Sequence, residues 1–183
     1  GSGNSNQTGF ASITYMANLA PGYYKLKVAF DGDSSYKSSS RTGTLVVNQE
    51  TTQLSDPSAS GTYGSSLSIG TYLKDDEGNP IGDRTVYFQY WRYPSWISLG
   101  SSITSSLGYA SISIIASMTP GSYPLRVLFV EDSYYTSSTR SGTLTVTKAS
   151  STITCTVSPS SLTYGQSVTV SGLISPAHDS VSV

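Results

Sequence analysis

The chain has one histidine, His178, and one cysteine, Cys155, among its 183 residues. A hydrolytic triad needs a histidine beside its nucleophile, and the GxSxG pattern of a nucleophile turn is absent from the sequence. A zinc centre needs several histidines or cysteines at short spacing, as in HExxH, and this pattern is also missing. The pattern around His178 is typical of a solvated loop histidine. We therefore expect no catalytic residues, no cofactor and no enzymatic activity.

Acidic residues gather in the segment KDDEGNPIGD, which contains Asp75, Asp76 and Glu77, with Asp83 nearby. Carboxylate oxygens are the ligands that calcium prefers. Their spacing does not match the D-x-[DN]-x-[DN]-G loop of an EF-hand, whereas Asp next to Gly and Pro is typical of tight turns. The sequence favours a polar turn, with Asp75, Asp76 and Glu77 as weak calcium candidates and no established metal site.

An aromatic run, YFQYWRYPSW, extends from Tyr87 to Trp96. Alternation along a strand sends Phe88 and Tyr90 to one face and Tyr87, Trp91 and Tyr93 to the other. One face must belong to the core. The other face either packs against a neighbouring module or stacks against sugar rings. The carbohydrate-binding candidates are Trp91, Tyr93 and Trp96.

Two residues, Asn6 and Cys155, are of types that can be covalently modified. Asn6-Gln7-Thr8 is the one N-x-[ST] sequon, so Asn6 is a glycosylation candidate in a predicted turn. Cys155 lies in a predicted early strand, where a free thiol packs as a small hydrophobe, so we expect it to be buried and inert. A single cysteine also excludes a disulfide within the chain.

Composition limits the classes of partner. Charged residues are 11% of the chain and the formal net charge is −1. No basic stripe indicates nucleic-acid binding, and no apolar run reaches the roughly 18 residues that span a bilayer. No signal peptide opens the sequence, so we expect any secretion signal to lie in a part of the protein outside these residues.

The sequence repeats itself. The segment Pro21–Val47 recurs at Pro120–Val146, an offset of 99 residues, with roughly half of the positions identical. A second match joins Thr62-Tyr63-Gly64 to Thr163-Tyr164-Gly165, at an offset of 101. We therefore divide the chain into 1–49, the C-terminal half of a repeat; 50–148, a complete repeat; and 149–183, the N-terminal part of a more divergent repeat.

The complete repeat predicts an all-β fold. Short segments with period-two alternation are separated by Gly, Pro, Asp and Ser clusters, with no helical periodicity. Seven strands are expected: a first strand at Thr51–Ser55 that ends in the turn DPSASG, and six more around 67–73, 84–93, 96–104, 108–115, 122–130 and 141–147. Seven strands in about 100 residues are typical of an immunoglobulin-like β-sandwich. Tyr24 and Tyr123 follow Pro-Gly turns in the position of a structural tyrosine corner.

Three motifs carry a resemblance to a known family. TYGxS(V/L)xI, PGxYxLxVxF and (G/E)DSxYxxSSxxGTLTV, in this order, resemble the immunoglobulin-like repeat domains of bacteria and archaea across essentially the whole chain. The resemblance implies tandem modules in a large secreted or surface-anchored protein, such as a stalk, an adhesin or a layer component. It implies no catalytic residue.

The function expected from these observations is structural and extracellular, at the cell surface. The expected partners are neighbouring immunoglobulin-like modules or copies of the chain itself, and surface glycans in the carbohydrate-binding alternative. Two arrangements stay open: the chain is a window of a longer tandem protein, or its partial modules at the two ends complete each other between subunits and form a head-to-tail filament.

Overall fold

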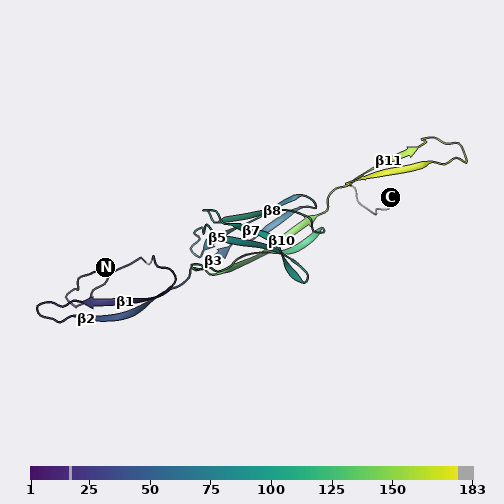
Figure 1. Ribbon diagram of the computed structural model, residues 1–183. Helices are drawn as coiled ribbons and strands as arrows, with labels where there is room; N and C mark the ends of the chain where they lie inside the picture. Colours follow the sequence, from purple (N-terminus) through teal and green to yellow (C-terminus); the bar gives the residue numbers. More distant parts are fainter. Residues whose placement is uncertain (17, 177–183) are drawn as a thin grey trace.

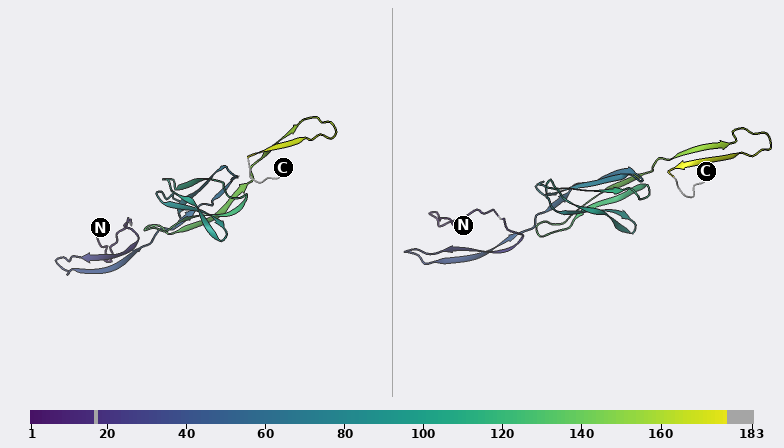
Figure 2. Two further views of the ribbon diagram at one scale, coloured as in Figure 1. Left: turned by 45° about the vertical axis from the view of Figure 1, so that its right-hand side comes forward. Right: turned by 45° about the horizontal axis from the view of Figure 1, so that its top comes forward.

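The computed structural model describes residues 1–16 and 18–176, which form twelve β-strands and no helix. The strands fall into three groups along the chain: a hairpin, a sandwich and a second hairpin (Figure 1). The two further views show the sandwich between the hairpins from other directions (Figure 2). Within the described part of the chain there is accordingly no helix of the length and apolarity that crossing a membrane requires. The all-β fold class predicted from the sequence is confirmed.

The sandwich consists of two sheets that pack face to face. The smaller sheet has the order β3-β5-β8 and the larger one β4-β10-β9-β6-β7. Apart from the parallel pair β4 and β10, all neighbouring strands are antiparallel. The bounds are β3 Thr52–Leu54, β4 Ser58–Thr62, β5 Ser66–Asp75, β6 Thr85–Arg92, β7 Ser95–Ile103, β8 Tyr109–Ile115, β9 Gly121–Phe129 and β10 Ser138–Thr147. This order is that of an immunoglobulin-like sandwich whose first strand contributes to both sheets.

The first strand differs from the prediction. DPSASG was expected to be a turn, but Ser58–Thr62 forms β4 and pairs in parallel with Thr143–Thr147 of β10. The chain crosses from one sheet to the other at Pro57, and a Cβ on Gly142 would lie 1.8 Å from the Pro57 carbonyl oxygen. Only glycine admits this approach. The sandwich therefore has eight strand segments, not seven.

The core follows the predicted alternation. Phe88 and Tyr90 of β6 are buried, as are Leu125, Val127 and Phe129 of β9. The facing sheet contributes a second set of buried apolar side chains: Leu54, Leu67, Ile69, Leu73 and Ala110. Each large apolar side chain that is fully buried stabilises the fold by about 1.5–3 kcal/mol relative to leaving it exposed. Hydrophobic burial, without a disulfide, holds the two sheets together.

The N-terminal hairpin consists of β1 (Gly22–Phe30) and β2 (Ser39–Val47). Its register, from Gly22 opposite Val47 to Phe30 opposite Ser39, repeats that of β9 and β10, from Gly121 opposite Val146 to Phe129 opposite Ser138. Residues 10–16 align with β8 but are not a strand. In the sandwich β8 pairs with β5, and within the described residues no strand pairs with 10–16.

The C-terminal hairpin consists of β11 (Thr152–Ser158) and β12 (Thr169–Ser175). Gln166 N–H donates to the Thr163 carbonyl (3.1 Å), as Ser65 N–H does to that of Thr62 (2.9 Å). Cys155, expected to be buried, is exposed. That prediction was wrong for this structure, because no second sheet covers the hairpin.

Candidate functional site

The linker between the N-terminal hairpin and the sandwich is hydrogen-bonded to one loop of the sandwich. Glu50 N–H donates to the Tyr134 carbonyl (2.8 Å), and the Glu50 carbonyl accepts from Thr136 N–H (2.9 Å). Gln49 Nε2 donates to the Asp132 carbonyl (2.6 Å). Glu50 and Tyr135 thus form an isolated parallel β-bridge. We call loop 131–137, with the linker docked on it, the junction loop.

Asp132 organises the junction loop. Its Oδ1 accepts hydrogen bonds from the backbone N–H groups of Tyr134 (2.8 Å) and Tyr135 (2.9 Å). Its Oδ2 lies 2.7 Å from Arg84 Nε in a partly buried ion pair, and Arg84 Cζ lies 5.1 Å from the Tyr135 ring centroid. The loop is therefore held in shape by contacts that do not involve the linker.

The same loop exists in the N-terminal hairpin. Asp33 Oδ1 accepts from the N–H groups of Ser35 (2.7 Å) and Tyr36 (2.8 Å), at the positions of Tyr134 and Tyr135. The repeated D-S-x-Y sequence thus encodes a repeated loop geometry. The sequence analysis did not predict that this loop docks a linker. The only signal for it in the sequence is that the D-S-x-Y motif occurs twice.

Two of the three weak calcium candidates approach a residue from the linker. The carboxylates of Asp76, Glu77 and Glu50 lie within 4.8 Å of one another and are exposed. Asp75 has a different role, since its carboxylate accepts from Asn79 N–H (2.6 Å) and from Asn79 Nδ2 (2.9 Å) within the turn. Sequence reasoning missed Glu50 because it is distant from Asp76 and Glu77 along the chain.

Side-chain hydrogen bonds shift the pKa values of these three carboxyl groups, and charge repulsion adds to the rise for Glu50 and Glu77. A hydrogen bond with the Asp76 side chain is the main cause that raises the pKa of Glu50 and the pKa of Glu77. A hydrogen bond from the Thr51 side chain, followed by those with Glu77 and Glu50, lowers the pKa of Asp76. Exposed acidic groups often lie together without an ion, so the cluster by itself does not establish a metal site.

The carbohydrate-binding candidates lie at the tip of the β6–β7 hairpin. Trp91 is opposite Trp96 in the register, with ring centroids 5.4 Å apart at 66°. Arg126 Cζ lies 4.1 Å from the Trp96 ring centroid, while Arg126 Nε donates to Gln89 Oε1 (2.8 Å). Tyr93 in the turn is 88% exposed. Arg126 therefore covers one face of the Trp96 ring. The Tyr93 ring is the aromatic side chain of this group that is most accessible to a ligand.

The two tyrosines predicted to be structural make equivalent hydrogen bonds. The Tyr24 hydroxyl donates to the Ala20 carbonyl (2.6 Å), and the Tyr123 hydroxyl donates to the Thr119 carbonyl (2.5 Å). The Tyr123 ring also packs edge-on against Tyr90, with centroids 5.6 Å apart. Each bond ties the start of a strand to the turn before it.

The sequon at Asn6 lies in an exposed turn. Asn6 Oδ1 accepts from the Thr8 N–H (3.0 Å), the Thr8 hydroxyl (2.7 Å) and the Phe10 N–H (3.0 Å). The Asn6 amide nitrogen, which would carry a glycan, takes part in none of these bonds. His178 lies outside the described residues.

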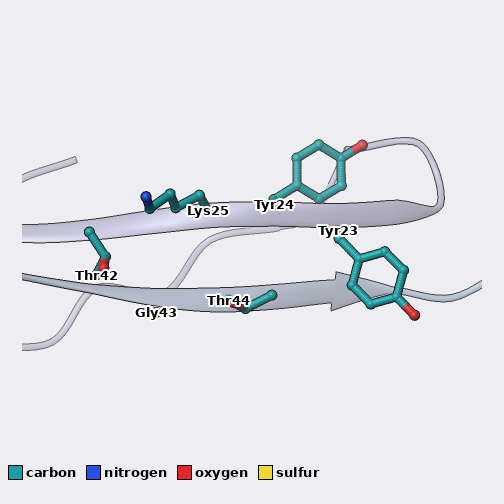
Figure 3. Close-up of a pocket in the computed structure, with 6 residues that line it drawn as sticks. All are labelled: Tyr23, Tyr24, Lys25, Thr42, Gly43 and Thr44. Carbon is teal, nitrogen blue, oxygen red and sulfur yellow. The ribbon is translucent and has the colours of Figure 1, made fainter.

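A hollow on the N-terminal hairpin has a volume of about 310 Å³ and is open to solvent. Figure 3 shows Tyr24 and Lys25 on one side of their strand and Tyr23 on the other. The lining residues are Tyr23, Tyr24, Lys25, Thr42, Gly43 and Thr44. They bring no nucleophile and base together, so the hollow offers no catalytic arrangement.

Comparison with known proteins identifies structural neighbours only. No protein-family model matches the chain, and no curated protein matches it. The D00-D0 domain of Intimin is 16% identical, with 79% of this chain and 76% of that chain covered and a TM-score of 0.40. Domains 4 and 5 of the S-layer protein SbsC are 14% identical, with coverage of 79% and 86% and a TM-score of 0.34. Murine CRIg is 13% identical, with coverage of 54% and 98% and a TM-score of 0.34.

At these identities and TM-scores, the class of the protein rests on its own strand order. The chain is an all-β protein with an immunoglobulin-like sandwich at its centre.

Proposed function

We propose that the chain belongs to a structural, non-enzymatic protein of the cell surface, built from immunoglobulin-like modules joined in tandem as a stalk, fibre, adhesin shaft or surface layer. In this proposal, residues 1–49 are the back half of one module, residues 50–148 a complete module, and residues 149–183 the front part of another. The protein would be secreted, and its partners would be neighbouring modules or further copies of itself.

The observation that carries the proposal is the docked linker. Only four residues separate β2 from β3. Two of them, Gln49 and Glu50, make hydrogen bonds to the junction loop. A short linker that is hydrogen-bonded to the module it enters limits the independent tumbling of the two modules that it joins. A protein that bears force or sets a distance at a surface needs such a limit. The Asp132 loop recurs at Asp33, which in this proposal would hold the linker of its own module in the same way.

The composition agrees with a structural role. Charged side chains are few and hydroxyl side chains are many, a composition suited to surfaces that pack against neighbours or carry glycans.

Surface exposure on intact producing cells tests this function. An antibody raised against the central sandwich should label unpermeabilised cells, and external protease should remove the labelling while a cytoplasmic marker stays intact. Labelling that appears only after lysis would contradict a surface role.

A carbohydrate-binding accessory module is the second candidate. The exposed ring of Tyr93 beside the Trp91–Trp96 pair favours it, whereas the Arg126 guanidinium over Trp96 reduces the area left for a sugar ring. Pull-down on insoluble polysaccharides compares the chain with the double variant Trp91→Ala, Tyr93→Ala. Equal retention of the two proteins would exclude this candidate.

A further inference from the structure

The two sides of the central sandwich, where its sheets end, differ in how their edge strands are protected. On one side the edge strands are β3 and β4, and on the other side they are β7 and β8. An edge strand has backbone N–H and C=O groups without partners, and these can pair with a strand of another chain. Soluble proteins prevent such pairing with short edge strands, proline or charged side chains.

The side formed by β3 and β4 has all three protections. β3 has three residues and β4 has five. Pro57 lies between the two strands, and next to it Asp56 Oδ1 forms an ion pair with Arg140 Nε at 2.7 Å. Both charged side chains are more than half exposed. A strand added along this side would meet a break in the edge and an ion pair that must stay in water.

The side formed by β7 and β8, which we call the β7–β8 side, lacks these protections. β7 has nine residues and β8 has seven, and neither strand contains proline. From Tyr93 to Leu125 the sequence contains no Asp, Glu, Lys or Arg. Within residues 1–16 and 18–176, no further strand pairs with the outer edge of β7 or of β8. The contrast between the two sides indicates that the β7–β8 side is an interface.

The order of the strands leaves this side open. β7 ends at Ile103 and β8 begins at Tyr109, so a short turn joins the two edge strands directly. No stretch of chain lies between them that could cover the side. Both strands have their inner neighbours, because β7 pairs with β6 and β8 pairs with β5. The open edges therefore belong to the complete repeat and to its topology.

Apolar side chains gather along the same side. Leu99, Ile112 and Ile114 pack against the core and remain partly exposed. Four further apolar residues of this side are exposed: Ile97 (38%), Ile103 (66%), Leu107 (71%) and Ile115 (59%). Exposed apolar surface of this extent on a soluble domain marks a contact with another protein.

We propose that the β7–β8 side binds the same side of a second copy of the chain. A two-fold axis perpendicular to the sheets places β7 beside β7 and β8 beside β8 of the second copy, each pair antiparallel. Both sheets then continue from one sandwich into the next. The inference rests on the structural function proposed above and specifies its partner, a copy that lies alongside.

Two observations favour a second copy over another partner. A second copy brings two edge strands with the same spacing, so it pairs with β7 and β8 together, whereas a single extended peptide pairs with only one of them. Nucleic acids and anionic membranes are held mainly by charge, which this side does not offer. The side also does not repel an identical one, and its serine hydroxyls can donate to and accept from their own kind.

A β-bulge limits the strength of the contact. Phe88 lies opposite Gly100 and Gln89 opposite Ser98, so Leu99 is an extra residue that divides β7 into two short runs. The register of β8 with β5 is continuous from Tyr109 to Ile115. We therefore expect β8 to supply the longer run of pairing, and the association to be reversible and dependent on concentration. In a protein with several such modules, these contacts would reinforce one another.

Hydrogen exchange of the 183-residue chain at low and at high protein concentration tests the proposal. Amide hydrogens on a free strand edge exchange with solvent, and pairing with a second strand slows them. Protection of residues 95–103 and 109–115 should rise with concentration. Residues 58–62 of β4 are the internal control, and their protection should not change. Because exchange is located by segment, association through the terminal hairpins cannot imitate this result.

A pair of double variants adds a matched charge to either side. Ser101→Lys with Ser113→Lys places one lysine on β7 and one on β8, and Gln53→Lys with Ser60→Lys places one on β3 and one on β4. All four positions are exposed, so unfolding of the sandwich followed by tryptophan fluorescence should occur at an unchanged temperature. The first variant should lose the concentration-dependent protection and sediment as a smaller species than the parent. The second should behave as the parent does.

Exchange of β7 and β8 that does not depend on concentration would overturn the proposal. Protection that persists in the variant Ser101→Lys, Ser113→Lys would also overturn it, as would an equal rise in the protection of β4. None of these results bears on the labelling of intact cells that tests the structural function. The surface role and the contact between copies can therefore fail independently.

Discussion

Glu50 and Tyr135 form a parallel β-bridge that fixes the linker of the N-terminal hairpin to the junction loop of the sandwich. The two residues are far apart in the sequence, and each belongs to a polar segment with no periodicity of its own. The bridge places the Glu50 carboxylate beside Asp76 and Glu77. One contact thus determines both how the linker is held against the sandwich and where negative charge accumulates.

Removing the carboxylate that shapes the junction loop should destabilise the central sandwich. Asp132→Ala removes two hydrogen bonds to backbone N–H groups and the ion pair with Arg84. We expect a loss of about 1–2 kcal/mol in the free energy of unfolding. Urea titration followed by tryptophan fluorescence measures it, because both tryptophans, Trp91 and Trp96, lie in the sandwich.

The matched control is Asp33→Ala, which removes the equivalent hydrogen bonds to backbone N–H groups in the N-terminal hairpin. It should leave the tryptophan transition unchanged. An equal effect of Asp33→Ala on the tryptophan transition would mean that the loss does not arise from the contacts of Asp132 within the sandwich.

The hydroxyl of Tyr123 should contribute measurably to the same transition. Tyr123→Phe keeps the ring against Tyr90 and removes the hydrogen bond to the Thr119 carbonyl. A loss of about 1 kcal/mol is expected. Tyr24→Phe, the equivalent change outside the sandwich, should have no effect on tryptophan fluorescence. If Tyr123→Phe left the free energy of unfolding unchanged, the Tyr123 hydroxyl would have no structural role.

The hydrogen bonds that Glu50 and Glu77 share with Asp76, reinforced by repulsion among these carboxylates, should make stability fall as pH rises. The pKa values of Glu50 and Glu77 are raised in the folded protein, so the folded state binds protons more tightly than the unfolded chain as pH passes above the ordinary value of 4.5. Stability is then lost as pH rises through the folded pKa values. The lowered pKa of Asp76 acts in the opposite direction at lower pH, where its stabilising contribution is lost as it takes up a proton.

Glu77→Gln removes one of the three charges and should raise the unfolding temperature at neutral pH. The gain should disappear in acid, where the carboxyl groups are protonated. Glu131→Gln removes an exposed charge outside the cluster and should show no such pH dependence. A Glu77→Gln variant less stable than the parent chain at neutral pH would contradict repulsion as the dominant effect.

Asn6 should accept a glycan if the chain passes through a secretory pathway that modifies N-x-T sequons. Expression in such a host should add the mass of a glycan to the intact protein. Asn6→Gln and Thr8→Ala should each remove that added mass. An unmodified parent protein would show that the turn at Asn6 is not a substrate.

The sequence by itself determined which residues of a strand share a face. Alternation along an extended chain is local geometry, so Phe88 and Tyr90 were expected on one face and Tyr93 on the other. The structure decided that the face of Phe88 and Tyr90 is the buried one. The same alternation places Leu125, Val127 and Phe129 on one face of β9, and all three are buried. The repeat likewise predicted which segments would share a fold, since equal patterns of apolar and turn residues encode equal local structure.

Only the tertiary structure decided the features that depend on partners distant along the chain. DPSASG reads locally as a turn, yet Ser58–Thr62 is a strand because β10 offers it a free edge. Residues 10–16 have a pattern similar to that of β8 and form no strand, because a strand needs a neighbour to bond. Cys155 is exposed for the same reason. Backbone hydrogen bonds in a sheet and burial between sheets join distant segments, so no local pattern can specify them alone.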